Sequence, residues 1–594
     1  MPFDGLVLAA VTEELAEKLT GGRIERVYQP VKDEIILVIH RPNLRCRLLL
    51  SAGALHPRIH MTTAVAENPT SPPPFCMLLR KYLEGGRISS FVQPDLERVL
   101  IIDIDSRDEL GSPAPKQLIL EIMGKHSNII LTDPTNGTIT DGIKRYSHAV
   151  SRYREVLPGR LYIPPPQQNK TNSMETGEEE FRAAFLRASL DSTLPQIIQQ
   201  CFSGMSLTTS REIVFRANLP FDMILDQCGE YELRSLWLAF RDCFANAAEG
   251  DFAPCLTIDN KGSLVDFAAL DLTHSELRRQ TGEMNSLLNL FYNNLVERRK
   301  IQQERNKILK TVNKETNKQK KKLNIFDKSI SDAAKATDLQ LFGELLTANI
   351  YQLEKGLNEA TLENYQDGAK LITIPLDPRK TPVENAQHYF KQYNKAKNTK
   401  IALASQIKQA QEIRDYLEGV ISDLEQSNDL SSLNEINQEL MEQGFVKMPL
   451  SIKKTAKKSK LKQKPQLLEA LSSDGMQIFV GKNNMQNDYL TLKIAQEHDI
   501  WLHTKDIHGA HVIIRTEGRE TSQSTLLEAA NLAAYFSKGR ISGNVPVDYT
   551  KRKHVSKPNG ARPGMVIYTH QKTIVSTPDE TLVERLLKPN INHN

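Results

Sequence analysis

The chain has 594 residues, of which 40% are hydrophobic and 25% charged, a composition that excludes a disordered protein. At this length several cores can be buried, so we expect about three to five domains. The 76 Lys and Arg nearly balance the 72 Asp and Glu, and the resulting charge of +4 does not by itself indicate a polyanionic partner.

The cysteine pattern and the N-terminal sequence indicate the compartment. The six cysteines are scattered, without a CxxC pair or a dense disulfide framework, which is typical of reduced thiols in a cytosol. The start MPFDGLVLAAVTEEL has no basic region, and no run of about 18 apolar residues occurs anywhere. We therefore expect a cytoplasmic protein without membrane contact.

The N-terminal part is predicted to be rich in β-strands. Short apolar runs and alternations over residues 24–131 are separated by Gly, Pro, Asn and Asp, as in an antiparallel sheet. Helices are expected at 7–19 and 75–83. A proline run at 164–166 and the polar stretch after it end this domain.

Helical spacing dominates the next part of the chain. Residues 179–244 predict a small all-α domain. Two heptad segments follow, one counted from Leu288 and one from Tyr393, with a helix-breaking stretch at 328–382 between them that contains the strand-like KLITIPLD. We expect an antiparallel coiled-coil hairpin carrying a small module at its tip; a continuous rod-like homodimer is the alternative.

A lysine-rich stretch separates the last domain from the rest. SIKKTAKKSKLKQKPQ contains seven lysines and no acid, which predicts a flexible basic linker. Strands are then expected at MQIFVG, DIWLHTK, HVIIRT and GMVIYT, with a helix in TSQSTLLEAANLAAYFSKG that begins at a Ser or Thr cap and ends at Gly539.

Familiar catalytic patterns are missing from the sequence. It contains no GxGxxG after a strand, no HExxH and no GxSxG, so we expect neither an enzyme nor a cofactor. A metal site is conceivable at Asp103 and Asp105, or at His503, His508 and His511. Two acids on a strand edge are usually solvated. Histidines without accompanying cysteines more often form hydrogen bonds within a hairpin, or contact phosphates and bases, so no metal is expected.

The basic residues are unevenly distributed. Residues 297–322 contain 11 Lys or Arg and 3 Glu, and residues 453–464 contain seven more lysines. Such concentration indicates contact with a phosphate backbone, so RNA or DNA binding is expected. The candidate nucleic-acid contacts are Arg298, Lys310, Lys314, Lys320, Lys321, Lys322, Trp501, His503 and Lys505.

A carboxylate interrupts one apolar strand. Glu121 in LILEIM needs a partner if it is buried, and the loop after it contains Lys125, His126, Ser and Asn donors that could hold a phosphate or a base edge. The alternative for this loop is a hairpin with polar residues at its tip. For Glu97 and Arg98, the corresponding alternative is an exposed charge pair.

Five stretches together resemble the NFACT family over essentially the whole chain. They are FDG at 3–5, EIMGKHSNIIL at 121–131, LLTANIYQLEKG at 345–356, PLDPRKTPVENAQHYFKQYNKAKN at 375–398 and NDYLTLKIAQEHDIWLHTKDIHGAHVII at 487–514. The resemblance implies an α+β multidomain protein: an NFACT-N domain (1–170), a helix-hairpin-helix domain (176–270), a coiled coil (271–441) with a middle module (about 328–382), the basic linker (442–466) and an NFACT-R domain (467–594).

The resemblance also implies a function. Such a protein binds a large ribosomal subunit still holding peptidyl-tRNA, recruits alanyl-tRNA and supports untemplated alanine tailing that marks the chain for proteolysis. It would contact ribosomal RNA and ribosomal proteins and would not itself make the peptide bond. The implied tRNA-binding positions, extended by two loop residues, are Asp4, Glu97, Arg98, Glu121, Ile122, Met123, Lys125 and His126. Glu97 stands where the family has an aspartate.

Two alternatives stay open. Members of this family are also described as fibronectin-binding surface proteins, although no export signal is seen here. Pro2 could become an N-terminal amine nucleophile, as in DNA glycosylases whose N-terminal domain is similar, but no zinc-ribbon cysteines follow.

Overall fold

The computed structural model describes residues 3–65, 67–149, 152–260, 262–334, 336–364, 368, 370–446 and 465–587. The chain divides into two compact units, Met1–Glu297 and Arg298–Asn594. Together they form a mixed α+β multidomain protein with a large antiparallel sheet, as the sequence predicts. The predicted basic linker falls mainly on 447–464, outside the described residues.

A nine-stranded antiparallel sheet dominates the first unit. Its strand order is β4-β3-β2-β1-β5-β6-β7-β8-β9, so it consists of two meanders joined where β1 pairs with β5. This sheet confirms the prediction made from the alternating runs. Its strands are β1 (Arg23–Tyr28), β2 (Glu34–Arg41), β3 (Leu44–Ser51), β4 (Arg58–Thr62), β5 (Arg87–Val92), β6 (Val99–Asp105), β7 (Lys116–Glu121), β8 (Asn128–Asp133) and β9 (Thr138–Gly142).

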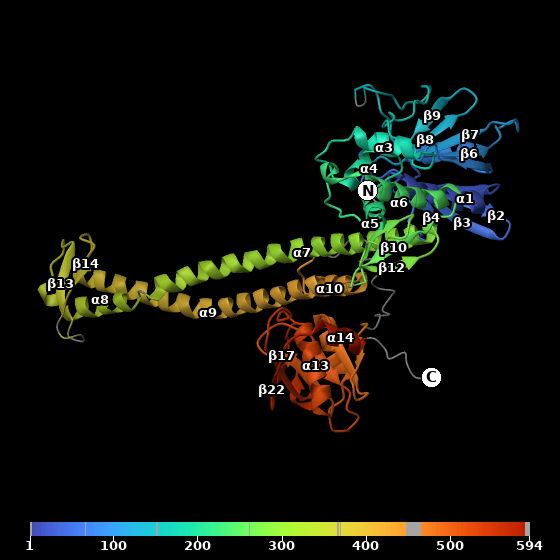
Figure 1. The fold of residues 1–594 in the computed structure, drawn as a ribbon. Helices are drawn as coiled ribbons and strands as arrows, with labels where there is room; N and C mark the ends of the chain where they lie inside the picture. Colours follow the sequence, from blue (N-terminus) through green and yellow to red (C-terminus); the bar gives the residue numbers. More distant parts are fainter. Residues whose placement is uncertain are drawn as a thin grey trace. The chain divides into compact units, whose positions relative to one another are not determined.

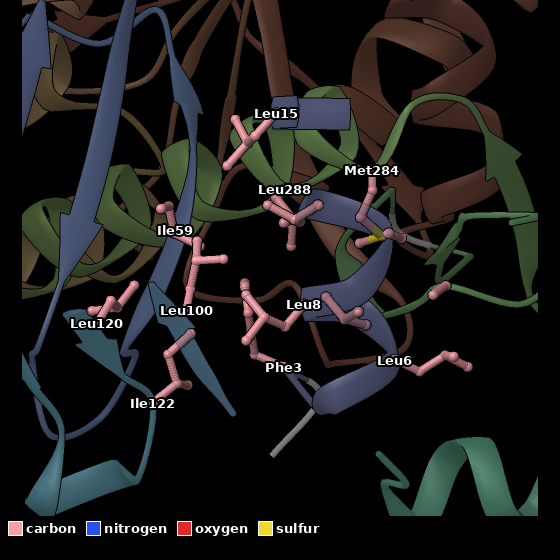
Figure 2. Packing of buried hydrophobic residues seen from close by; sticks show 14 of the residues in the cluster. Phe3, Leu6, Leu8, Leu15, Ile59, Leu100, Leu120, Ile122, Met284 and Leu288 are labelled. Atoms are coloured by element: carbon pink, nitrogen blue, oxygen red, sulfur yellow. The ribbon is translucent and has the colours of Figure 1, made fainter. Parts of the chain in front are cut away.

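Helices α1 (Gly5–Leu19) and α2 (Pro74–Leu83) lie within a few residues of the two predicted helices. Figure 2 shows the core around α1, where Leu8 and Phe3 lie near Leu100 and Leu288. Each fully buried side chain of this size contributes about 1.5–3 kcal/mol. Phe3 is thereby fixed to the sheet, which positions the residues just after it.

The predicted all-α region contains α3 (Glu178–Leu186), α4 (Leu194–Cys201), α5 (Leu207–Arg216) and α6 (Glu230–Ala248). A three-stranded sheet that the sequence analysis did not predict follows, formed by β10 (Cys255–Ile258), β11 (Leu264–Ala268) and β12 (Arg278–Thr281). Strands of four or five residues give little periodicity. The polar strand β12 is fully exposed, so it carries no alternation at all.

Two long helices, α7 (Met284–Ala334) and α9 (Pro382–Gln426), run side by side in opposite directions (Figure 1). Ile301, Ile308 and Val312 of α7 pack with Leu417 and Leu424 of α9. The remaining elements of this part are α8 (Ala336–Ala348), β13 (Glu359–Asn364), β14 (Lys370–Pro375) and α10 (Leu430–Glu442), and β14 contains the strand-like segment predicted between the helices.

The C-terminal part forms a six-stranded sheet in the order β15-β16-β18-β17-β19-β22. Its helix α13 (Gln523–Tyr535) is capped by Ser522, as predicted, but ends at Tyr535 before Gly539. None of the helices in the described ranges is long and apolar enough to cross a membrane. The other elements are β15 (Leu468–Leu471), β16 (Gln477–Gly481), α12 (Asn484–Tyr489), β17 (Ile500–Thr504), β18 (His511–Ile514), β19 (Val545–Lys551), β20 (Val555–Ser556), β21 (Ile567–Tyr568), β22 (Lys572–Ser576) and α14 (Glu580–Leu587).

Candidate functional site

A polar pocket of about 310 Å³ lies in the first unit, where four distant stretches of sequence meet. It is lined by the start of α1, the turn between β5 and β6, the polar segment before α3, and the end of α4 with the turn to α5. The pocket brings together three of the predicted tRNA-binding residues. Its lining is Asp4, Gly5, Leu96, Glu97, Arg98, Gln168, Lys170, Gln199, Gln200, Ser203, Gly204, Met205 and Ser206.

The Phe-Asp-Gly motif has a structural explanation at each position. Phe3 is buried in the core, and Asp4 caps α1 by accepting a hydrogen bond from the Val7 N–H at 2.9 Å. A Cβ on Gly5 would approach the Leu96 carbonyl oxygen to 2.0 Å, so only glycine fits there. The motif therefore locks the N-terminus against the turn that precedes Glu97.

Asp4 also joins two helices. Its second carboxylate oxygen accepts hydrogen bonds from the Ser206 N–H at 2.9 Å and the Thr209 hydroxyl at 2.8 Å, at the N-terminus of α5. A carboxylate is favoured at the positive end of a helix. Burial raises the pKa of Asp4 above its ordinary value, against the effect of these hydrogen bonds. Asp4 is thus a fixed wall of the pocket and is almost fully buried.

The turn before Glu97 and Arg98 is unusual in its backbone. Asp95 and Leu96 have φ values of 44° and 56°, a left-handed conformation that is uncommon for residues other than glycine. The Gln93 side-chain amide holds the turn by donating to the carbonyl oxygens of Gly5 at 2.8 Å and Glu97 at 2.9 Å. Glu97 and Arg98 are consequently half-buried pocket residues, so the alternative of a fully exposed charge pair is wrong.

Lys170 is a pocket residue that the sequence analysis missed. Its ammonium group donates to the Gln199 carbonyl oxygen at 2.7 Å. Burial lowers the pKa of Lys170, and the neighbouring charge of Arg98 lowers it further. Two cations therefore lie close together in one pocket, an arrangement suited to an anionic group. No signal distinguished this lysine, because it stands within the polar stretch that reads as a linker.

Glu121 lies at the end of β7 and is fully buried. Its carboxylate accepts two hydrogen bonds of 2.6 Å from the Arg154 guanidinium and one of 3.0 Å from the Tyr162 hydroxyl. The prediction that a buried carboxylate here needs a partner is confirmed, and the partner comes from a distant loop. Neither Glu121 nor the equally buried Ile122 is open to a ligand in this structure, which argues against direct contact by these two side chains.

The loop after Glu121 is accessible. Lys125 and His126 are exposed in a short 3₁₀ turn, Gly124–His126, and Met123 is half-buried. The Ser127 hydroxyl accepts a hydrogen bond from the Met123 N–H at 2.7 Å, which fixes the turn. Contact between this loop and a nucleic acid stays a prediction, and the structure leaves two cationic or polar side chains free to make it.

The basic residues of α7 form a solvated surface. All six predicted contacts on this helix are exposed. Lys320 pairs with Glu418 of α9 at 2.9 Å, and the Lys322 ammonium lies 5.3 Å from the centre of the Phe326 ring. The six residues are Arg298, Lys310, Lys314, Lys320, Lys321 and Lys322.

The three predicted contacts in the C-terminal part differ in accessibility. Trp501 is fully buried, so its ring cannot stack on a base, and His503 stacks on it with ring centres 5.7 Å apart. Burial lowers the pKa of His503 to about 4. Lys505 is exposed, and so is its neighbour Asp506. The prediction for Trp501 is thus corrected: the indole belongs to a core.

The histidine cluster does not assemble a metal site in the described ranges, where no group of three or more His, Cys, Asp or Glu is placed to hold a metal ion. His508 instead hydrogen-bonds the Asp423 carboxylate of α9 at 2.7 Å. Burial lowers the pKa of His508, but the Asp423 charge and hydrogen bond outweigh it, so the pKa is raised overall.

Glu439 of α10 is buried where that helix meets the C-terminal part of the second unit. Its carboxylate accepts hydrogen bonds from the Tyr416 hydroxyl at 2.6 Å and from the Asn484 side-chain amide at 3.0 Å. Burial raises the pKa of Glu439 to about 7. The neighbouring Glu435 accepts hydrogen bonds from Asn483 and Gln486, so acids of α10 meet amides of α12 and its cap.

Two family models match the chain. The model described as NFACT N-terminal and middle domains matches residues 4–463, and the model described as NFACT protein RNA binding domain matches residues 466–569. The pocket lies within the first match and the six-stranded sheet largely within the second. The chain is thus a protein of the NFACT class.

Sequence comparison with known relatives identifies the group within the NFACT class to which the chain belongs. The Rqc2 homologue RqcH of Bacillus subtilis (strain 168) is 42% identical, over 99% of this chain and 100% of its own length. The chain therefore belongs to the RqcH group of the NFACT family. The human ribosome quality control complex subunit NEMF is 32% identical over 131 residues, 22% of this chain and 11% of its own. The N-terminal structure of a fibronectin/fibrinogen-binding protein from Streptococcus suis is 32% identical, covers 49% of this chain and 99% of that one, and has a TM-score of 0.40.

Proposed function

We propose that this protein is a ribosome-associated quality control factor that binds large ribosomal subunits holding peptidyl-tRNA and recruits alanyl-tRNA for untemplated alanine tailing. Its membership in the RqcH group over 99% of its length and its similarity to NEMF, a ribosome quality control complex subunit, support the role in ribosome quality control. The RNA binding domain matched at residues 466–569 supports RNA as a partner.

The observation that carries the proposal is the pocket of the first unit. It gathers Asp4, Glu97 and Arg98, which the family resemblance implies in tRNA handling, and adds the cation of Lys170. Arg98 and Lys170 would bind phosphate, while the fixed carboxylates would favour a particular nucleotide arrangement. Met123, Lys125 and His126 would extend the tRNA contact, and Glu121 and Ile122 would act by holding that loop.

In this role the protein supplies position and not chemistry. Peptide-bond formation stays with ribosomal RNA, and a factor that holds alanyl-tRNA in place contributes through proximity. The proposal therefore needs neither an enzyme active site nor a cofactor, and it places the protein in the cytoplasm with ribosomes.

The finer domain layout belongs to the same proposal. Helices α3–α6 would form the helix-hairpin-helix domain, and α7 with α9 the antiparallel coiled coil, with α8, β13 and β14 as its middle module. The exposed cations of α7, from Arg298 to Lys322, would contact ribosomal RNA.

The test is fractionation of cells in which ribosomes are stalled, with large-subunit fractions probed for this protein and its bound tRNA. Wild-type protein is expected in those fractions with tRNA. Arg98→Ala is expected to lose tRNA and keep the subunit, whereas Arg107→Ala, an exposed arginine on a neighbouring turn, is expected to keep both. Absence of the wild-type protein from large subunits under stalling contradicts the proposal, and loss of subunit binding in Arg98→Ala contradicts the division of roles.

A further inference from the structure

The C-terminal part of the chain contains a basic stretch that none of the sites above uses. Residues 465–587 hold 14 Lys and Arg against 13 Asp and Glu. Six of those cations, and no acid, fall within residues 549–572. The rest of this part is therefore acidic, with eight cations against 13 acids, and its positive charge is confined to one segment.

Half of the six cations are committed to internal contacts. The Arg552 guanidinium donates to the carbonyl oxygens of Thr491 and Val555, and Lys557 pairs with Asp488. The Arg562 guanidinium lies over the Tyr416 ring, 5.1 Å from its centre. Arg552 and Lys557 thus fix the segment to the body of the domain, and Arg562 joins it to α9.

The other three cations are Lys551, Lys553 and Lys572, all exposed. Within the described ranges none of them forms an ion pair with a carboxylate. Lys551 ends β19, and Lys572 begins β22, the edge strand of the six-stranded sheet, where it lies opposite Tyr549. Lys551 and Lys572 thus lie on adjoining strands, and Lys553 lies in the short 3₁₀ turn Arg552–His554 that directly follows β19.

The backbone that presents them is held in place. The Thr550 hydroxyl donates to the carbonyl oxygen of Thr569 at 2.9 Å, and the Thr569 N–H donates to the carbonyl oxygen of His554 at 3.2 Å. His570 adopts a left-handed conformation with φ of 56°, which makes the turn into β22 tight. A binding surface built on fixed backbone loses little entropy when a ligand binds.

Two imidazoles lie between the lysines. The rings of His554 and His570 are 4.5 Å apart at an angle of 30°. Partial burial and the charges of His570, Lys553 and Lys551 lower the pKa of His554 below its ordinary value. An imidazole ring offers a flat face for base stacking and a nitrogen for a ribose hydroxyl.

We propose that this surface, formed by Lys551, Lys553, His554, His570 and Lys572 and named the basic ribbon, is where the C-terminal domain binds the phosphate backbone of RNA. The inference rests on the proposed function, because it gives the RNA binding domain its contact surface. The rival surface is the loop after β17, where the exposed Lys505 stands next to the exposed Asp506, while Trp501 is buried within β17 itself. One acid, Glu497, is exposed near the ribbon, and its carbonyl oxygen accepts the Lys553 N–H at 3.1 Å.

The test measures binding of the full chain to a short fluorescein-labelled RNA hairpin by fluorescence anisotropy over a series of salt concentrations. The ribbon variant Lys551→Ala/Lys553→Ala/Lys572→Ala is compared with the control Arg519→Ala/Lys538→Ala/Arg585→Ala. Both remove three exposed cations from the same domain. Exposed substitutions of this kind change stability little, so thermal unfolding of both variants should match the wild type.

The ribbon variant is expected to bind the RNA at least about tenfold more weakly at low salt, and the slope of its log association constant against log salt concentration should be shallower by about two to three. The affinity of the control should stay within about twofold of the wild type. Ultraviolet cross-linking of wild-type complexes should label peptides from residues 549–572. This second measurement is independent of RNA bound by other basic segments.

Equal losses in the two variants would show general electrostatic attraction and overturn the inference. So would full RNA binding by the ribbon variant, or cross-links confined to the loop after β17. Failure of the wild-type protein to bind any RNA contradicts the proposed function itself, and is therefore distinguishable from failure of the ribbon alone.

Discussion

Replacement of Glu121 separates a structural role from direct tRNA contact. The side chain is fully buried, and the side chain of its partner Arg154 is only 11% exposed. Glu121→Ala leaves a guanidinium charge buried without its carboxylate, and breaking such a pair costs about 3–5 kcal/mol. Tyr162 loses its acceptor as well. Calorimetry should show the unfolding transition of the first unit lowered by roughly 5–15 °C.

A double variant tests how the loss arises. Replacing a whole buried ion pair by apolar residues of similar size is often neutral, so Glu121→Leu/Arg154→Met should recover most of the stability. If Glu121 acts by holding the loop, tRNA binding recovers with it. Glu109→Ala, which breaks an exposed pair with Lys81, should cost less than about 1 kcal/mol. A stable double variant that binds no tRNA refutes the structural role, and a cost below about 1 kcal/mol for Glu121→Ala refutes the energetic reasoning.

Three further predictions concern the pocket and the contact of α10. Gly5→Ala should destabilise the first unit by at least about 3 kcal/mol in denaturant unfolding, because the new Cβ would meet a backbone oxygen. The control Gly177→Ala has open space around its Cβ and should cost under about 1 kcal/mol. Lys170→Met should weaken tRNA binding while large-subunit binding is kept, and equal tRNA affinity would remove Lys170 from the site. The pKa of Glu439 is about 7 in the folded protein, above the ordinary 4.5, so the folded state holds the proton more tightly than the unfolded state does. The free energy of unfolding should therefore fall as the pH rises from 4.5 to 7, by up to about 3 kcal/mol. Glu439→Gln should flatten this pH dependence between pH 5 and 8, whereas the exposed control Glu442→Gln should leave it unchanged. An unchanged pH profile in Glu439→Gln would contradict the assignment.

Local patterns were enough to predict much of the fold. Alternating apolar runs predict an antiparallel sheet, which the structure shows with nine strands, and the Ser and Thr residues of TSQST predict the helix cap that Ser522 forms for α13. The short strands β10 and β12 were missed, because four residues carry too little periodicity and β12 has no apolar face. Gly539 was taken as a helix end although α13 stops four residues earlier, at Tyr535.

The candidate site was predicted only in part, because its assembly is a tertiary property. Burial of Glu121 could be inferred from the apolar residues around it, but the identity of Arg154 as its partner depends on a loop 33 residues away. Lys170 carried no signal within a polar stretch. The polar loop beside Trp501 predicts a nucleic-acid contact, whereas both faces of β17 are covered, so that Trp501 and Leu502 are buried in separate clusters on opposite sides of the strand.

Charge was the most informative sequence property, but a third basic segment was overlooked. The near-neutral total conceals basic stretches in α7 and at 453–464, which the composition analysis identified. The acid-free segment at 549–572 was visible in the same sequence. It stood out only once the structure showed which of its cations are exposed.

The central claim is that this protein brings alanyl-tRNA to stalled large subunits. Sequencing of the tRNA that co-purifies with the protein on large-subunit fractions tests it most directly. The account predicts strong enrichment of alanine tRNA over its share of total tRNA, lost in Arg98→Ala. Large-subunit complexes in which the tRNA mirrors the cellular pool, or which hold no tRNA beyond the peptidyl-tRNA, would contradict it.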